Sequence, residues 1–151
     1  MSSTPTRTPD VGLREVRDED LDALFEFQRD PVAVPMVGIG SRSREDFDAH
    51  WARIRTDAGT VLRTITADGA VAGWAVVFTL DGRRNLGYWL GREFWGRGVA
   101  SAAVTQLLAE VSERPLWGVV LAGNRGSRRV LEKHGFEIVD EGDEVLYLLE
   151  G

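Results

Sequence analysis

The chain has 151 residues, 43% of them hydrophobic and 28% charged, which fits one globular domain and excludes a disordered or membrane protein. Its 18 basic and 24 acidic residues give a net charge of −6, which argues against nucleic acid as a partner, and no apolar run is long enough to cross a membrane. The absence of cysteine excludes disulfides, thiolate metal sites and a cysteine nucleophile, and no metal site is expected.

The N-terminal segment MSSTPTRTPD is polar and rich in Thr and Pro. It lacks the apolar stretch of a signal peptide, so residues 1–10 are predicted to form a flexible tail. A single folded domain is predicted over residues 11–151, and a cytoplasmic location is expected.

A short strand over residues 11–16 is followed by Asp18, which is expected to cap a first helix. Prolines end this helix, and the next segment, 31–41, contains several breakers of regular structure. It is therefore predicted to be a loop, which either contacts a ligand or simply connects two helices. Ser43 stands three residues before an aspartate, the spacing of a capping box, and is predicted to begin a second helix.

The middle of the chain predicts three antiparallel strands, over residues 61–66, 71–80 and 86–90, joined by the turn sequences ADGA and DG. A long helix with one apolar face follows the third strand and stops before Pro115. The apolar run 116–121 then predicts a strand that is buried on both faces.

The last part of the chain predicts a short helix between Asn124, a favoured N-cap residue, and Gly135, a favoured residue at helix ends. Strands over 136–139 and 145–149 follow, joined by the acidic turn 140–144. In chain order, these elements predict one α+β domain, with a mixed, mostly antiparallel sheet of about seven strands and about four flanking helices.

The turn that precedes the long helix, GREFWGRG, predicts an anion site. Gly96 and Gly98 leave room beside the first free N–H groups of the helix, where the helix dipole favours negative charge. Residues 94–109 contain no carboxylate although the chain is acidic overall, and Arg92 and Arg97 flank the turn. A negatively charged group such as a phosphate is therefore expected at this helix start.

Two motifs resemble the GNAT superfamily of acyl-CoA-dependent N-acetyltransferases. The first, YWLGREFWGRGVA over residues 88–100, is similar to the pattern of the branch that includes the ribosomal-protein alanine acetyltransferases. The second, NRGSRRVLEKHGF over residues 124–136, follows the superfamily pattern N-x-x-S-x-x-V-L-E-K-x-G-F without a break. The resemblance spans nearly the whole folded part, and it implies a single-domain GNAT-like fold with acetyl-CoA as cosubstrate.

The resemblance also implies which residues bind acetyl-CoA. In the family, the amides of the turn hold the CoA pyrophosphate, and the pantetheine arm runs beside the strand before the turn, which here ends in Trp89 and Leu90. Trp95 departs from the wider superfamily, which has Gln or Arg at this position, but the branch shares the departure. The residues expected to bind acetyl-CoA are Trp89, Leu90, Trp95, Gly96, Arg97, Gly98, Val99, Ala100, Ser101 and Asn124.

The family reaction is direct attack of an amine on the thioester, with no covalent enzyme intermediate. Many members carry a tyrosine acid two residues before the lysine of the second motif, where this chain has Leu131. In the similar branch the serine of this motif has that role, so Ser127 is the candidate catalytic acid and Asn124 an orienting or water-holding group. Ser127 as a CoA ligand or as a plain first-turn residue stays open, and no base is identifiable.

The function predicted is acetyl transfer from acetyl-CoA to a primary amine of a small molecule or a peptide. The alternative is a non-catalytic acyl-CoA-binding sensor or scaffold domain. A dinucleotide-binding oxidoreductase is disfavoured, because Ser101 replaces the third glycine of that fingerprint and the strand ending at Leu121 is not followed by an acid for the ribose.

The acceptor pocket is expected between the first two helices, the 31–41 loop and the last hairpin. Acidic clusters at 18–20 and 140–144 favour a cationic or polar amine. Ribosomal protein N-termini, antibiotics, polyamines and amino acids are all compatible acceptors. Nucleic acid and membranes are not expected partners, and the sequence is compatible with a monomer or a homodimer.

Overall fold

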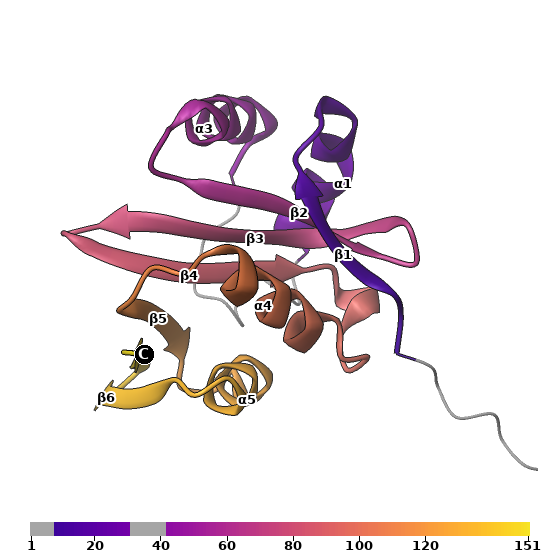
Figure 1. The fold of residues 1–151 in the computed structure, drawn as a ribbon. Helices are drawn as coiled ribbons and strands as arrows, with labels where there is room; N and C mark the ends of the chain where they lie inside the picture. The colour runs from indigo at the N-terminus through magenta and orange to yellow at the C-terminus, as the bar shows by residue number, and fades with distance from the viewer. Residues whose placement is uncertain (1–7, 31–41) are drawn as a thin grey trace, which may run out of the picture.

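A computed structural model describes residues 8–30 and 42–151. Within these ranges the chain forms one seven-stranded mixed sheet in the order β1-β2-β3-β4-β5-β7-β6 (Figure 1). The strands are β1 (Val11–Glu15), β2 (Val61–Ala67), β3 (Ala70–Leu80), β4 (Arg83–Leu90), β5 (Leu116–Leu121), β6 (Glu137–Glu141) and β7 (Glu144–Leu149). The helices are η1 (Asp18–Asp20), α1 (Leu21–Gln28), α3 (Arg44–Thr56), η2 (Arg92–Phe94), α4 (Val99–Glu110) and α5 (Arg125–Lys133).

The predicted α+β class and mixed sheet are thereby confirmed. The predicted loop 31–41 lies outside the described residues, as does most of the predicted tail. Asp10, at the end of that tail, exchanges two hydrogen bonds with Asp68, at 2.8 and 2.9 Å. None of the helices in the described ranges has both the length and the apolar character needed to cross a membrane.

Two tight hairpin turns set the order of the first strands. Asp68 and Gly69, between β2 and β3, have φ values of 50° and 84°, and Asp81 and Gly82, between β3 and β4, have φ values of 52° and 76°. Two successive residues with positive φ form the turn that matches the right-handed twist of a hairpin. The short polar turn sequences therefore fix the antiparallel pairing of β2, β3 and β4.

The pairing changes direction after β4. Strand β5 lies parallel to β4, and Asn85 opposite Trp117 is the one register pair between them. Beyond Asn85, β4 continues to Leu90 without a further pair on β5. The sheet is therefore split along this edge of β4.

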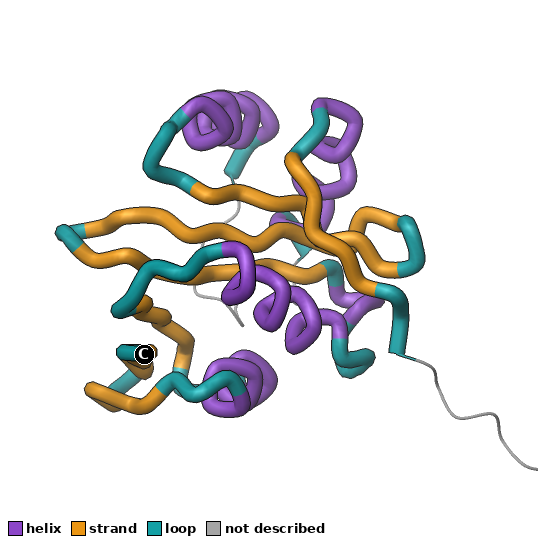
Figure 2. The backbone as a smooth tube through the Cα atoms, viewed as in Figure 1, coloured by secondary structure: helices purple, strands orange, loops and turns teal. Residues whose placement is uncertain are grey.

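Helices cover the sheet from two sides: α1 and α3 lie on one face and α4 and α5 on the other (Figure 1). Figure 2 shows the same two helical layers on either side of the strands. The larger core lies under α4, where Ala103 and Leu107 are fully buried. On the other face, Leu24 of α1 and Phe47 of α3 are fully buried against the sheet.

Two local predictions are wrong, and the tertiary arrangement explains both. Asp18 does not cap α1: its exposed carboxylate pairs with Arg55 at 2.7 Å, while the buried Asp20 accepts the backbone N–H of Arg17 at 2.8 Å. Strand β5 is not buried on both faces, since Val119 is 52% exposed. Helices α1 and α3 lie over the half of the sheet that contains β1 to β4, and this face of β5 has no helix over it among the described residues (Figure 1).

Candidate active site

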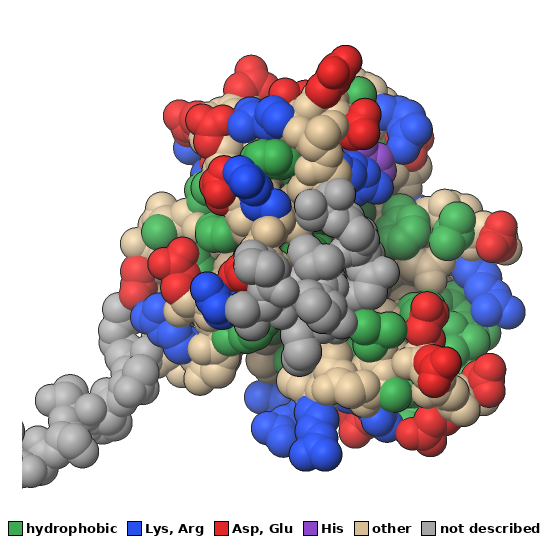
Figure 3. All heavy atoms as spheres, turned by 180° about the vertical axis from the view of Figure 1, so that it is seen from behind, with side chains coloured by type: hydrophobic (Ala, Val, Ile, Leu, Met, Phe, Trp, Pro, Cys, Tyr) green, Lys and Arg blue, Asp and Glu red, His purple; other side chains and the backbone are tan. Residues whose placement is uncertain are grey.

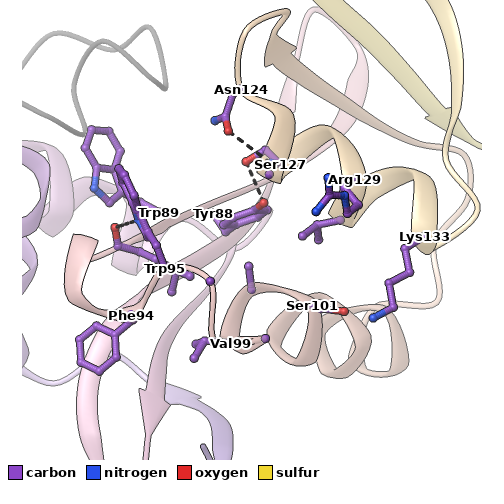
Figure 4. A pocket seen from close by; sticks show the side chains of 16 residues that line it. Tyr88, Trp89, Phe94, Trp95, Val99, Ser101, Asn124, Ser127, Arg129 and Lys133 are labelled. Atoms are coloured by element: carbon purple, nitrogen blue, oxygen red, sulfur yellow. Dashed lines mark hydrogen bonds between the residues drawn. The ribbon is translucent and has the colours of Figure 1, made fainter. Parts of the chain in front are cut away.

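A cavity of about 490 Å³ lies between the end of β4, the turn into α4, and α5 (Figure 4). The predicted site residues that line it are Trp89, Leu90, Trp95, Gly96, Gly98, Val99, Ala100, Ser101, Asn124 and Ser127. The predicted Arg97 is exposed and is not among the lining residues. Lining residues that were not predicted as site residues are Tyr88, Phe94, Gly126, Arg129, Val130 and Lys133.

The start of α4 is built on glycine. Gly98 is its N-cap, with a φ of 77° and no side-chain cap, and Gly96 has a φ of 70°. Both values lie in the left-handed region, where a side chain is strained. The N–H groups of Val99, Ala100 and Ser101 begin the helix and have no acceptor within it. With no acidic residue in the first turn, this helix start presents a positive potential to the cavity.

The pairing register of β4 decides which of its backbone groups face the cavity. In an antiparallel pair, alternate residues direct their N–H and C=O groups toward the partner strand. The N–H of Gly91 donates to the carbonyl of Ala72 on the β3 side at 2.9 Å. Trp89 therefore belongs to the set whose backbone groups face β3, and Tyr88 and Leu90 belong to the set that faces away from β3.

This alternation places the backbone groups of Tyr88 on the cavity side of β4. Leu90 also presents its backbone groups on the cavity side, whereas Trp89, which lines the cavity as well, directs its backbone groups toward β3. The Leu90 carbonyl accepts the indole N–H of Trp95 at 3.1 Å, which shows the direction in which it points. The indole of Trp89 lies on the other face of the sheet, where its N–H donates to the carbonyl of Phe27 at 3.2 Å.

The start of α5 brings together the two predicted catalytic residues and one tyrosine that was not predicted. The side-chain oxygen of Asn124, the N-cap, accepts the backbone N–H of Ser127 at 3.3 Å. The Ser127 hydroxyl oxygen lies 2.8 Å from the hydroxyl oxygen of Tyr88 (Figure 4). Burial raises the pKa of the Tyr88 phenol, and the hydrogen bond to Ser127 offsets part of that rise. Tyr88 therefore stays protonated at neutral pH.

The position that holds a tyrosine acid in many superfamily members is structural here. Leu131 is 2% exposed and belongs to the core beneath α4. A Cβ added to Gly118 of β5 would lie 3.0 Å from its side chain, so helix and strand are in close contact at this point. Leu131 therefore packs α5 against the sheet and faces away from any chemistry.

The positive side chains at the cavity come from α5. Arg129 and Lys133 are one helical turn apart and line the cavity (Figure 4). The two arginines predicted to flank the turn do not line the cavity. Arg92 pairs with Asp30 at 3.2 Å, and Arg97 is exposed. The sequence shows that α5 is rich in basic residues. Which of them face the cavity depends on where the helix begins, because residues four positions apart lie on the same side of a helix.

The fold, the glycine-rich helix start and the second motif have the pattern of the GNAT superfamily. Residues 10–137 match the family model described as acetyltransferase (GNAT) domain. The chain therefore belongs to this family, whose members are typically acetyl-CoA dependent.

Over 106 residues the chain is 31% identical to a Bacillus subtilis (strain 168) protein named "Putative ribosomal N-acetyltransferase YdaF". The match covers 66% of this chain and 57% of the length of that relative. The spermidine N-acetyltransferase from Vibrio cholerae, solved with CoA and spermine, matches with a TM-score of 0.78 at 11% identity over 91% of this chain and 92% of that one. RimJ from Mycobacterium smegmatis, solved with CoA-disulfide, matches with a TM-score of 0.73 at 23% identity over 93% and 82% of the two chains. At these identities the structural matches show a shared fold.

Proposed function

We propose that this protein transfers an acetyl group from acetyl-CoA to a primary amine. The observation that carries the proposal is the cavity. The start of α4, which has no acidic residue, lies on one side of it, and backbone groups of β4 lie on another. Two structural relatives were solved with CoA or CoA-disulfide, which supports the same ligand class.

The residues around the cavity fit the chemistry of CoA. Its pyrophosphate needs hydrogen-bond donors and positive potential, and the amides from Gly96 to Ser101 supply both. Arg129 and Lys133 at the same cavity suit its phosphate groups. The backbone groups of Tyr88 and Leu90 suit the amide-rich pantetheine arm, because an extended chain pairs with a free strand edge. The volume of about 490 Å³ lies in the range of pockets that hold small molecules.

The reaction requires three events at one carbonyl. The amine nitrogen forms a bond to the acetyl carbon and loses a proton, the C–S bond breaks, and the departing sulfur receives a proton. We assign the proton donor to Ser127, whose hydroxyl lines the cavity, and the positioning of Ser127 to Asn124, which binds its backbone N–H. An N–H group of β4 on the cavity side is our candidate for stabilising the carbonyl oxygen.

The acceptor is proposed to be an amine that approaches from the face opposite the CoA phosphates. An α-amino group, with a reference pKa near 8, is deprotonated more readily than a lysine side chain. The relative with a ribosomal name makes peptide N-termini the first class to test, and the spermidine enzyme makes polyamines the second.

One predicted determinant of acceptor charge is weakened by the structure. Within the 18–20 cluster, Asp20 is only 1% exposed and Asp18 is paired with Arg55. Over the part of the molecule that carries α1 and α3, acidic and basic side chains are interspersed (Figure 3). Asp20 therefore has a structural role, and the exposed Asp18 and Glu19 and the 140–144 turn are the acidic groups left to test.

The first experiment is thermal unfolding with and without acetyl-CoA. A ligand that binds only the folded state stabilises it by about 2.7 kcal/mol at a hundredfold excess over Kd. Gly98→Asp should abolish this stabilisation by placing a carboxylate at the helix start. Gly82→Asp is the matched control, because Gly82 also has a positive φ, with nothing within 4 Å of an added Cβ. A normal ligand effect in folded Gly98→Asp would refute the phosphate site.

The second experiment measures CoA thiol release with a panel of amines: ribosomal-protein N-terminal peptides, polyamines, amino acids and aminoglycosides. Acetyl transfer predicts release above the hydrolysis background with at least one class. Acetyl-CoA binding without release for any class would instead favour the sensor or scaffold function.

A further inference from the structure

We propose that Tyr88 is a positioning residue for the transfer step, which orients the Ser127 hydroxyl toward the cavity and replaces the proton that Ser127 gives up. This inference rests on the proposed function, in which Ser127 protonates the departing sulfur.

The geometry that carries the proposal is a contact between two elements far apart in the sequence. Tyr88 comes from β4 and Ser127 from the first turn of α5, and their hydroxyl oxygens are 2.8 Å apart. Both residues line the cavity, and the two side chains point toward one another (Figure 4). Since Asn124 holds the backbone of Ser127 at the same time, the Ser127 hydroxyl has a fixed place.

The number of protons on the two hydroxyls explains why Ser127 needs Tyr88 as its partner. A serine hydroxyl has one proton, so Ser127 either donates to Tyr88 or directs its proton elsewhere. If Tyr88 donates to the Ser127 oxygen, the Ser127 proton is free to point into the cavity. Burial keeps the pKa of Tyr88 above its usual range, so the phenol retains the proton it needs for this role at neutral pH.

The same pair balances the transfer step. As the C–S bond breaks, the electron pair stays on sulfur, the Ser127 proton moves to sulfur, and the Tyr88 proton moves to the Ser127 oxygen. The amine nitrogen releases one proton to water as the amide forms, and water returns one proton to the Tyr88 phenolate, so the protons balance and no charge stays on the protein. Even with its pKa raised by burial, a phenol loses a proton more readily than an aliphatic alcohol does. The relay thus avoids a serine alkoxide.

The chain offers a matched control, because Tyr147 is its only other tyrosine. The Tyr147 hydroxyl also contacts α5, donating to Glu132 at 2.5 Å and accepting from Arg128 at 3.1 Å. Tyr147 is fully buried and does not line the cavity. Each of the variants Tyr88→Phe and Tyr147→Phe therefore removes one phenol hydroxyl that contacts α5. The Tyr88 hydroxyl lies at the cavity, and the Tyr147 hydroxyl lies away from it.

The first test needs no acceptor and uses CoA itself as the probe. The thiol of bound CoA is titrated by its ultraviolet absorbance, with desulfo-CoA as the reference. A Ser127 hydroxyl that donates to the sulfur favours the thiolate, and without the Tyr88 donor this hydroxyl is no longer oriented toward it. Tyr88→Phe should therefore raise the pKa of the bound thiol by about one unit relative to wild type. Tyr147→Phe should leave it unchanged. Equal thiol pKa values in wild type and Tyr88→Phe would overturn the proposal.

The second test is kinetic and uses the most active amine of the panel. Tyr88→Phe and Ser127→Ala should each lower kcat by about tenfold to a hundredfold, with the Kd of CoA within a few-fold of wild type. Because the two residues act as one unit, the double variant should be no slower than the slower single variant. Losses that multiply in the double variant, or a Tyr88→Phe kcat within twofold of wild type, would contradict the relay. A wild type that releases no thiol would instead refute the proposed function itself.

Discussion

The carboxylate of Asp20 ties together three parts of the fold, and replacing it with asparagine should destabilise the protein in a pH-dependent way. Asp20 accepts two hydrogen bonds from Arg14 of β1, at 2.7 and 2.8 Å, and one from the Thr64 hydroxyl of β2 at 2.8 Å. It also accepts the N–H of Arg17 at the start of η1. The side chain is 1% exposed, so water cannot replace these donors.

The magnitude follows from the pKa of this group. Burial raises the pKa of Asp20, but the hydrogen bonds from Arg14, Arg17 and Thr64 outweigh it and lower the value from 3.8 to about 2. This difference corresponds to about 2 kcal/mol of stability at pH 7. Because the folded-state pKa is the lower one, the contribution is complete above the unfolded-state value and is lost as the pH falls from about 5 toward 2.

Asp20→Asn should therefore unfold about 6 °C below wild type at pH 7. The difference in unfolding temperature between the two proteins should be smaller at pH 3, where the wild-type carboxylate begins to be protonated. Thermal unfolding of both proteins between pH 7 and pH 3 tests this. Asp22→Asn is the control, since Asp22 lies on the adjoining helix with an 87% exposed side chain paired to Arg44. A difference that stays constant with pH, or no difference at pH 7, would refute the reasoning.

The remaining predictions concern the cavity and the strand that borders it. The double variant Arg129→Gln, Lys133→Gln should bind CoA about tenfold more weakly and with a smaller dependence on salt, because two proposed phosphate partners are lost. Titration calorimetry at two salt concentrations measures this. Arg125→Gln, on the same helix, is the control and should have little effect. Gly73→Ala should destabilise the fold by about 3 kcal/mol or more, because the added Cβ would lie 1.9 Å from the carbonyl oxygen of Trp89. Gly87→Ala, whose Cβ would lie an ordinary 3.7 Å from its nearest neighbour, should cost far less, and equal melting temperatures for these two variants would contradict the β3–β4 register.

The features that the sequence predicted well are those set by local chemistry. The turn at Asp81 and Gly82 has positive φ at both residues, as a two-residue hairpin requires. Asn124 caps α5 through its side chain, and Gly135 adopts a φ of 90° after the helix ends. The Ser43 hydroxyl accepts the N–H of Asp46 at 3.1 Å, as its spacing indicated. Each of these outcomes depends on residues within a few positions of one another.

The features that it missed depend on pairing across the chain. Asp18 and Asp20 are equivalent acids in one turn, and Asp20 is the buried one because it accepts hydrogen bonds from Arg14 of β1 and from Thr64 of β2, 44 residues away. Tyr88 directs its backbone groups toward the cavity edge because of the β3–β4 register, which is set by the turn at the far end of this hairpin. A shift of one residue would reverse it, because neighbouring strand residues face opposite ways.

The end of β4 is an unpaired strand edge, and the neighbouring residues Tyr88 and Trp89 show how its position is stabilised. Beyond Asn85, β4 has no register pair on β5, so its end needs support from another direction. Trp89 provides it on the face opposite Tyr88: it stacks on Trp74 of β3 at 5.4 Å, and Trp74 meets Trp51 of α3 at 5.2 Å. Aromatic pairs of this kind add stabilisation beyond the area they bury. The aromatic stack on the α3 side thus holds the strand whose other face and edge are left open for the cavity.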